Sequence, residues 1–479
     1  MRKRVLFVLV AIALLACVLG ALVACESYKA TALKVVSDKN AVVESNGGLV
    51  VKQGDYLYFI NGYADYLTDK GKDNWFGNVT KGAIVRVTYY EDGTLGDDPV
   101  IVVPKSVMAS SENVGFSIFG EYIYYVSPSA EEDRTGKVQT DTLQFMRTKI
   151  DGTGTQVILN IDDTSVKYKY TSTALFYYKS EEKELYAKDL TAKSFKANKD
   201  GTLISDKVSS VYFPVNETYD PSKTETAIGD YVFYTKSSED SYEYSNSLYV
   251  VSPAALTESK EVINPETYAD GKYSISVIGA SVEGDKLAIY YTKTSYVGTS
   301  SSGEVVGTYA YQFTSTAFSF NADNEKKLTS ESLSSIFVLS YAEGVVVSGS
   351  STKTALYHND GTVDTFGDLK MDTLVAVTDT TFYYVKDNKL LFYNRDNASN
   401  AGLCYTEDKS TMTSFTGVEY FEGCLFLIVD DDYDYVYRLK VSTIDVADRD
   451  ALVFERIGIV TDADNEKMEE EAKKDEEDE

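Results

Sequence analysis

The sequence predicts an all-β fold made of repeated units, and three observations carry this prediction. A short run of alternating apolar and aromatic residues recurs seven to eight times, often after Gly-Asp or Gly-Glu. A second short apolar run follows each copy, and several of these second runs are followed by Asp-Gly, a pair typical of tight hairpin turns. Helical periodicity is almost absent from the body of the chain. Together these features favour a ring or a stack of small antiparallel sheets.

The repeats are regular enough to define the architecture. Eight copies of the first strand begin at Gly54, Gly120, Ser172, Gly229, Gly284, Gly344, Asp379 and Glu422. The mean spacing is about 53 residues, close to the periods of solenoids and propellers. The second strands lie at 84–87, 143–147, 184–187, 247–250, 309–313, 355–357, 390–393 and 435–438. An extended segment precedes many of these pairs, which makes about four strands per repeat. Four-stranded sheets repeated around an axis form a β-propeller, so we predict eight four-stranded blades, with seven as the alternative.

The first 25 residues resemble an export signal with a lipid-attachment site. Three basic residues at positions 2–4 precede an apolar run over 5–24. The run ends Leu-Val-Ala-Cys at Cys25, and this resembles the lipobox of bacterial lipoprotein signal peptides. The resemblance implies lipidation of Cys25, which becomes the new N-terminus, and a body held at the extracytoplasmic side of the cell membrane. An uncleaved transmembrane anchor is the alternative, since about 20 apolar residues span a bilayer.

The chain then divides into a signal peptide over 1–24, a lipidated tether over 25–44, a propeller over 45–460 and an acidic tail over 461–479. It carries 46 Lys and Arg against 74 Asp and Glu, and its net charge of −28 becomes −31 without the signal peptide. Such a body repels nucleic acid, so no nucleic-acid partner is expected. The tail holds 11 acidic side chains and no apolar periodicity. We expect it to be disordered, with a fraying polar helix as the alternative.

The repeat unit resembles the YWTD-type propellers of low-density lipoprotein receptors, and more closely those of uncharacterised bacterial surface lipoproteins. The strand that ends in two aromatic residues is degenerate here, as in Tyr-Tyr-Val-Ser at 124–127. The following pattern survives best from Phe-Met-Arg at 145–147 to Asp-Gly at 151–152. The resemblance covers roughly residues 45–460 and implies a fold without a specific ligand. We interpret the Tyr and Phe residues of these strands as packing between blades.

A candidate binding site lies in the first long loop. If the repeated strand is the second of its blade, all loops that follow it open on one face, where a propeller builds binding surfaces. The single Trp of the chain, Trp75, lies in the first of these loops with Phe76, Tyr63 and Tyr66. A Trp-Phe pair beside Asn and Asp suits stacking on a sugar ring or anchoring of a protein partner. The alternative is that Trp75 folds back over its own loop.

Motifs for catalysis and metal binding are nearly absent. The sequence has no Gly-x-Ser-x-Gly elbow, no His-Glu-x-x-His and no Gly-rich phosphate loop before a helix. The single histidine, His358, ends a strand before an Asp-Gly turn, and we interpret it as structural. The densest acidic loop contains Asp430, Asp432 and Asp434, whose oxygens suit Ca²⁺. A solvated hairpin loop is the favoured interpretation of this segment, and no other cofactor is expected.

Removal of the predicted signal peptide also removes Cys17. Besides the lipidated Cys25, the processed chain then has two cysteines, Cys404 and Cys424, in neighbouring predicted blades. An extracytoplasmic location permits a disulfide between them. Their strands need not bring them close enough, so two buried thiols that behave as small hydrophobes are the favoured interpretation.

We therefore expect a lipid-anchored, extracytoplasmic β-propeller that acts as a binding or scaffolding module for an envelope protein or a glycan. The alternative is a surface carbohydrate-active enzyme, a glycoside hydrolase or lyase with carboxylates at the central channel. Convergent carboxylates with raised pKa values at the channel would favour the enzyme. A third hypothesis is a purely structural disc that holds the tether of a larger complex.

Overall fold

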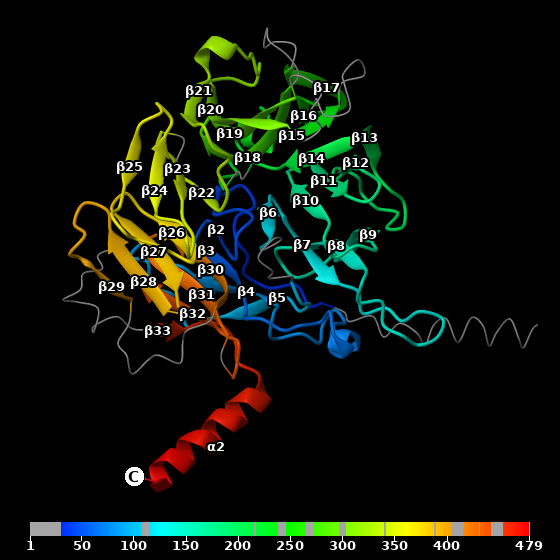
Figure 1. Cartoon of the computed structure of the whole chain (residues 1–479). Helices are drawn as coiled ribbons and strands as arrows, with labels where there is room; N and C mark the ends of the chain where they lie inside the picture. Colours follow the sequence, from blue (N-terminus) through cyan, green and yellow to red (C-terminus); the bar gives the residue numbers. More distant parts are fainter. Residues whose placement is uncertain are drawn as a thin grey trace, which may run out of the picture.

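The strands form eight separate antiparallel sheets, arranged as the blades of one ring (Figure 1). The last blade of the chain, in orange and red, lies beside the first, in blue, so the ring is closed (Figure 1). The all-β propeller is thereby confirmed, with eight blades and not seven. The structure is a computed structural model that describes residues 30–107, 115–214, 217–237, 246–264, 273–296, 303–339, 342–387, 389–404, 415–430, 432–441 and 454–478.

Each blade is built from strands that follow one another in the sequence, and the blades are numbered 1 to 8 along the chain. Blades 1 to 4 are β1 (Val43–Glu44), β2 (Val50–Gln53), β3 (Tyr56–Ile60), β4 (Ile84–Thr88) and β5 (Val100–Val103); β6 (Ser117–Phe119), β7 (Tyr122–Pro128), β8 (Leu143–Lys149) and β9 (Gln156–Ile161); β10 (Lys167–Tyr170), β11 (Ala174–Lys179), β12 (Glu184–Asp189) and β13 (Thr202–Ser205); β14 (Val208–Tyr212), β15 (Val232–Ser237), β16 (Asn246–Ser252) and β17 (Ala255–Ile263).

Blades 5 to 8 are β18 (Tyr273–Glu283), β19 (Lys286–Ser295), β20 (Glu304–Phe313) and β21 (Lys326–Thr329); β22 (Ile336–Val338), β23 (Gly344–Val347), β24 (Ala355–His358) and β25 (Val363–Thr365); β26 (Thr373–Val377), β27 (Thr381–Lys386), β28 (Lys389–Asn394) and β29 (Ala401–Leu403); β30 (Phe415–Phe421), β31 (Cys424–Val429), β32 (Val436–Lys440) and β33 (Phe454–Arg456). Contacts between β2 and β6, β14 and β18, β18 and β22, and β26 and β30 place these strands around the axis. The described loops also contain the 3-10 helices η1 (Asp69–Asp73), η2 (Ile228–Asp230) and η4 (Ala322–Asn324).

The two ends of the disc differ in their connections. The repeated aromatic segments are β3, β7, β11, β15, β19, β23, β27 and β31, as the repeat predicts, and the connections that follow them open on one end, which we call the loop face. The other end, the turn face, carries the hairpin turns. Three predicted Asp-Gly turns have a left-handed glycine, at Gly93, Gly152 and Gly361 (φ +78°, +81° and +92°). Gly201 differs, because a Cβ there would meet the Ala187 carbonyl oxygen at 2.1 Å.

The aromatic residues of the repeat pack inside the blades, and blade 5 shows the arrangement most fully. Tyr291 is buried and stacks on Tyr309 with ring centroids 6.1 Å apart. Lys293 lies 3.8 Å above the Tyr309 ring and forms an ion pair with Glu325, which also accepts a hydrogen bond from the Tyr291 hydroxyl. Similar stacked pairs join β11 to β12 and β15 to β16: Tyr177 with Tyr186 and Tyr234 with Tyr249. Aromatic residues also pack between neighbouring blades, as predicted: Phe145 of blade 2 meets Tyr168 of blade 3 edge-on at 5.0 Å, and Tyr383 of blade 7 stacks on Tyr420 of blade 8 at 6.3 Å.

The N-terminal part of the described chain crosses the turn face before it enters the ring. We call residues 33–42 the N-terminal strap. The Leu33 amide donates a hydrogen bond of 3.0 Å to the Asp151 carbonyl, in the outer turn of blade 2. The buried Ser37 hydroxyl then donates to Gln53 Oε1 at 2.6 Å, at the end of β2. The chain continues as β1, which pairs with the inner edge of β2 and gives blade 1 a fifth strand.

A second segment enters the central channel beside β1. We call the connection between β14 and β15, residues 213–231, the channel loop. Val43 and Tyr219 exchange two backbone hydrogen bonds of 2.8 and 3.0 Å, and the Asn46 amide donates to the Glu217 carbonyl at 2.8 Å. The first blade and the fourth blade therefore meet across the axis. This contact joins residues that are distant in the sequence, and the repeat does not predict it.

The ring closes between blade 8 and blade 1, a junction that we call the seam. Every described strand of blade 8 belongs to the last repeat, so no strand is exchanged between the two blades. Side chains make the connection instead. The buried Asn61 amide donates to the carbonyls of Thr80 (2.9 Å) and Ile459 (2.7 Å) and accepts from the Ile459 amide at 3.0 Å. An ion pair between Lys52 and Glu422 (2.7 Å) adds to the seam at the turn face.

The acidic tail forms the helix α2 (Asp462–Asp478), the only α-helix in the described residues, and it projects away from the ring (Figure 1). The expected disorder is therefore corrected in favour of the helical alternative. Thr461 caps the helix, because its hydroxyl accepts from the Asp464 amide at 3.2 Å and donates to the Asp464 carboxylate at 2.8 Å. Asp464 in turn pairs with Lys81 (3.4 Å) and accepts from the Tyr435 hydroxyl (2.6 Å), which fixes the first turn to the loop face.

Two further predictions concern the cysteines and the N-terminal segment. Cys404 and Cys424 are both free and buried, which confirms the favoured interpretation of two thiols. The predicted signal peptide and Cys25 lie outside the described residues. Within those residues, no helix has the length and apolar character needed to cross a membrane.

Candidate functional site

The predicted binding loop, residues 61–83 between β3 and β4, lies on the loop face and rests on the buried Asn74. The Asn74 amide donates to the Ser127 hydroxyl (3.0 Å) and to the Pro128 carbonyl (2.8 Å) of blade 2. Its side-chain oxygen accepts from the Ser106 amide at 2.9 Å. Each polar atom of this side chain is thus bonded to a different segment. Asn74 fixes the loop to the connection between blades 1 and 2.

Lys105 completes the support beneath this loop. Only 3% of its surface is exposed. Its ammonium group donates to the carbonyls of Asn74 (2.8 Å) and Pro128 (3.3 Å). Burial lowers the pKa of Lys105 to about 7, against the opposing effect of the Glu131 charge. A buried amine with two carbonyl partners stiffens the base of the loop, so the residue next to Asn74 is presented from a fixed position.

Trp75 is the one residue of the predicted set that is clearly displayed to solvent. It is 51% exposed, so it does not fold back over its own loop, and Leu67 of the same loop is 40% exposed. Phe76 is half-buried and packs against the core of blade 1. Tyr63 and Tyr66 are half-buried, and burial raises the pKa of both hydroxyls. The candidate site is therefore a loop with one exposed aromatic residue, Trp75, and three half-buried aromatic residues.

The acidic loop between β31 and β32 adjoins the binding loop across the seam. The Tyr63 amide donates to the Asp434 carbonyl at 2.9 Å. The structure thus brings two of the predicted segments, far apart in the sequence, to one side of the loop face. No group of three metal-ligating side chains occurs among the described residues, so Asp430, Asp432 and Asp434 are not gathered into a metal site there. In that position the acidic loop adds negative charge beside the aromatic loop.

The central channel holds two carboxylates that the sequence did not single out. Glu419 of β30 accepts from the Val50 amide at 2.9 Å and from the Ser45 hydroxyl. Burial raises its pKa to about 7, and the charge of Glu217 adds to this shift. Glu217, on the channel loop, stays in contact with solvent, while the protein that surrounds it raises its pKa as well. The charge of Glu217 therefore disfavours the charged form of Glu419, whereas burial alone raises the pKa of Glu217.

Lys169 of blade 3 binds the channel loop, which blade 1 contacts through Val43 and Asn46. It lies on β10, and its ammonium group donates to the carbonyls of Pro214 (2.5 Å) and Gly229. Burial lowers the pKa of Lys169 to about 8, while the Asp230 charge acts in the opposite direction. Both ends of the channel loop are thus bound to blade 3. The channel contains an inserted loop with a basic anchor and two weakly acidic groups.

Glu217 and Glu419 were not identified from the sequence. The chain has 74 acidic residues, and their spacing in the sequence does not show which of them lie together at the channel. A usable signal existed nonetheless. Glu419 is the only charged residue of β30, whose other six residues are uncharged. A single carboxylate in an inner strand has to face either the water of the channel or a hydrogen-bond partner, because burial of an unpaired charge is costly. His358, by contrast, lies at the outer edge of blade 6, where its Nε2 is 2.8 Å from Asp364 Oδ2, far in the fold from the channel strands.

No protein-family model and no curated protein matches the chain. Among solved structures it is similar to apo AztD from Citrobacter koseri, with a TM-score of 0.38 and 11% identity over 81% of this chain and 92% of that one. It is similar to an oligogalacturonate lyase in complex with manganese (TM-score 0.32, 10% identity, 83% and 94% covered). A third similarity is to a chain of a nidogen/laminin complex (TM-score 0.25, 8% identity, 68% and 91% covered).

Proposed function

We propose that this protein is a lipid-anchored, extracytoplasmic β-propeller that binds a partner of the cell envelope on its loop face. The observation that carries the proposal is that the N-terminal strap and the Trp75 loop lie on opposite faces of the ring. The N-terminal strap is bonded to the turn face, through Leu33 to Asp151 and through Ser37 to Gln53. The Trp75 loop opens on the opposite face. A tether that leads from the strap to Cys25 would hold the turn face toward the membrane and direct the loop face outward.

The loop face favours a protein partner over a glycan. Trp75 and Leu67 expose apolar surface on one rigid loop, and a buried aromatic anchor supplies much of the energy in many protein interfaces. Preorganisation by Asn74 and Lys105 lowers the entropic cost of ordering such an anchor on binding. The acidic loop and the acidic helix α2 stand on the same face, so a partner with a basic surface is favoured.

The binding proposal is tested by capture from envelope extract with a soluble version of the chain that begins at Glu26. We expect Trp75→Ala to reduce capture of the specific partner about tenfold or more. Tyr90→Ala is the matched control, because Tyr90 is equally exposed, at 52%, but follows β4 on the turn face. If Tyr90→Ala reduces capture as strongly as Trp75→Ala, the loop face is not the binding surface.

The anchoring proposal is tested separately by metabolic labelling with a palmitate analogue. We expect the full-length protein to incorporate the label and to stay with the membrane fraction. Cys25→Ser should abolish both properties, whereas Cys17→Ser, in the same apolar run, should leave them unchanged. Label that is retained in Cys25→Ser would contradict lipidation at this cysteine.

A carbohydrate-active enzyme is the second candidate function, and the carboxylates of the channel favour it. Glu217 and Glu419 both have raised pKa values, as an acid that donates a proton near neutral pH requires. Against this role, Glu419 already bonds Ser45 and Val50, which is the pattern of a structural bridge. Cleavage of an envelope polysaccharide that disappears in Glu217→Gln, with the fold retained, would establish the enzyme and overturn a purely binding role.

A further inference from the structure

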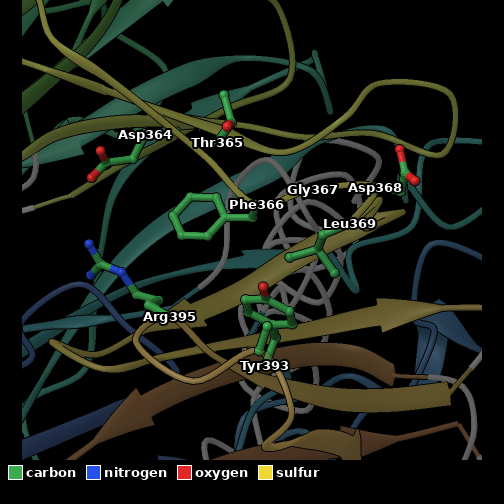
Figure 2. A pocket seen from close by; sticks show the side chains of 9 residues that line it. Asp364, Thr365, Phe366, Gly367, Asp368, Leu369, Tyr393 and Arg395 are labelled. Carbon is green, nitrogen blue, oxygen red and sulfur yellow. The ribbon is translucent and has the colours of Figure 1, made fainter.

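A pocket of about 620 Å³ opens at the outer edge of the ring between blades 6 and 7, and we call it the rim pocket (Figure 2). One wall is the segment Asp364–Leu369, which comprises the end of β25 and the connection to blade 7. The other wall is Tyr393 of β28 with Arg395 and Ala398 of the turn that follows. The volume lies within the range of pockets that enclose small organic ligands. The rim pocket is distant in the fold from the loop that carries Trp75.

The pocket exists because the outer strands of these two blades are short. β25 has three residues, all exposed, and β29 also has three, whereas the outer strand of blade 4 has nine. A short outer strand leaves the facing side of the next blade uncovered at the rim. Phe366 and Tyr393 are consequently only half-buried, although most aromatic residues of the inner strands are fully enclosed.

The floor of the pocket is a fixed aromatic cluster. Phe366 meets Phe382 edge-on at 5.0 Å and Tyr393 edge-on at 6.2 Å, and Phe382 stacks on Tyr393 at 6.4 Å. Leu369 lies on the same wall as Phe366. Because each ring is held by another, the apolar floor is formed before any ligand arrives. Such a floor suits the C–H face of a ring that carries its polar groups around its edge.

Donor and acceptor groups surround this floor. In Figure 2, Asp364 and Arg395 lie toward the same end of the pocket, with the ring of Phe366 beside them. Arg395 donates to the Thr378 carbonyl (3.2 Å) and forms an ion pair with Glu343. These contacts fix the guanidinium group and use two of its five donors. Asp364 supplies a carboxylate acceptor at the same end, so a ligand group between them can both accept and donate.

The charged side chains of the rim pocket are of both signs, and we expect them to favour neutral ligands over ionic ones. Asp364 is bonded to His358, and Asp368 is paired with Lys353 at 2.6 Å. A cationic ligand would meet Arg395, and an anionic ligand would meet both aspartates. Each charged side chain at the pocket already has a polar partner in the protein. Hydroxyl groups, which donate and accept, match both the carboxylates and the guanidinium group.

We propose that the rim pocket binds a short neutral saccharide, with sugar C–H faces against Phe366 and Tyr393 and hydroxyl groups bonded to Asp364 and Arg395. This site is separate from the loop face and does not depend on the function proposed there. A propeller with both sites would hold a glycan at its rim while a protein partner occupies its loop face. The ligand expected from the sequence is a protein or a glycan. The rim pocket provides a glycan site that is separate from the protein site on the loop face.

The test is calorimetric titration of the full-length protein in detergent with maltotriose, cellotriose and N,N′-diacetylchitobiose. A galacturonic acid dimer and a glucosamine dimer serve as the anionic and cationic probes. Binding of at least one neutral saccharide, stronger than binding of either charged probe, is expected. Ala398→Trp, which fills the pocket, and Asp364→Ala, which removes the acceptor, should each weaken it about tenfold or more. Asp396→Trp is the matched control, since Asp396 is exposed in the same turn but does not line the pocket.

Each other result overturns the proposal. Absence of binding for all three neutral saccharides would exclude this ligand class. Preference for a charged probe would overturn the neutral assignment. Saccharide binding that survives Ala398→Trp but is lost in Trp75→Ala would move the glycan site to the loop face. Because Trp75→Ala and Ala398→Trp affect different faces, failure at the rim pocket and failure of the loop-face proposal can be told apart.

Discussion

The seam between blades 8 and 1 and the rim between blades 6 and 7 join neighbouring blades in opposite ways. At the seam the two blades come from the two ends of the chain, and polar side chains such as the buried Asn61 and the half-buried Glu419 link them. Blades 6 and 7 are continuous in the chain, and their outer edges are left apart around the pocket that Phe366 lines. The chain already joins blades 6 and 7, and the ion pair of Arg395 with Glu343 links them beside the pocket. The surface between their outer strands stays uncovered and is available to a ligand.

The difference explains why polar side chains link the first blade to the last. A ring closed without strand exchange has to prevent its first and last blades from separating. Hydrogen bonds from Asn61 to Ile459 and from Val50 to Glu419 cross the seam at two depths. Such bonds are specific in geometry, and leaving one partner unpaired in the interior is costly. We therefore expect substitutions at the seam to affect stability and substitutions at the rim to affect binding.

The largest effect is expected for Asn61→Ala. The substitution leaves the backbone groups of Thr80 and Ile459 without their side-chain partner in a buried position. We expect a loss of about 2–4 kcal/mol in the free energy of unfolding, measured by urea denaturation. Asn78→Ala, an exposed asparagine of the same loop, and Thr365→Ala at the rim should each change it by less than about 0.5 kcal/mol. Equal losses at the seam and the rim would remove the proposed difference between them.

A smaller, pH-dependent effect is expected for Glu419→Gln. The pKa of Glu419 is raised to about 7, so the folded protein retains a proton that the unfolded chain releases near pH 4.5. Its stabilising contribution is full below about pH 4.5 and is lost as the pH rises through 7. The amide side chain of glutamine resembles the protonated carboxyl group. The variant should therefore match the wild type at pH 5 and exceed its unfolding free energy by about 1–2 kcal/mol at pH 8, after allowance for partial solvent exposure.

Urea titrations at the two pH values check this prediction. Glu304→Gln provides the control, because Glu304 is exposed at the start of β20 and should show no such difference between the two pH values. A Glu419→Gln protein that is less stable than the wild type at pH 8 would mean that the charged carboxylate is favoured at the seam. The bridge to Val50 and Ser45 would then act as a charge-assisted link.

The smallest effect is expected for Lys52→Met. Lys52 pairs with Glu422 at 2.7 Å and with Glu44 at 3.0 Å, but all three side chains are partly exposed. Exposed ion pairs contribute little, so we expect a loss of about 0.5–1 kcal/mol that shrinks in about 1 M salt. Lys353→Met breaks the more exposed rim pair with Asp368 and should have no measurable effect in the same denaturation assay. A larger loss at Lys353 would place the stronger electrostatic contribution at the rim.

Much of the fold was predictable because the repeat is local. Each aromatic strand and its hairpin partner are adjacent in the sequence, and the Asp-Gly turns at Gly93, Gly152 and Gly361 are formed as expected. The candidate loop was predictable in position, because the chain has one Trp and it lies in the first long loop. Its support by Lys105 was not predictable, because that residue follows the last strand of blade 1 and its role depends on burial between two blades.

The sequence by itself determined the repeated four-stranded sheets, their order and the face on which Trp75 lies, and it favoured eight blades over seven. It could do so because alternation and turn residues act over a few neighbouring positions. Only the tertiary structure decided how the ring closes, what enters the channel and where a pocket opens. The pairing of Val43 with Tyr219, the approach of Glu217 to Glu419 and the rim pocket beside Phe366 all depend on segments brought together by closure of the ring. Local periodicity carries no information on such contacts, since they follow from the geometry of the assembled blades.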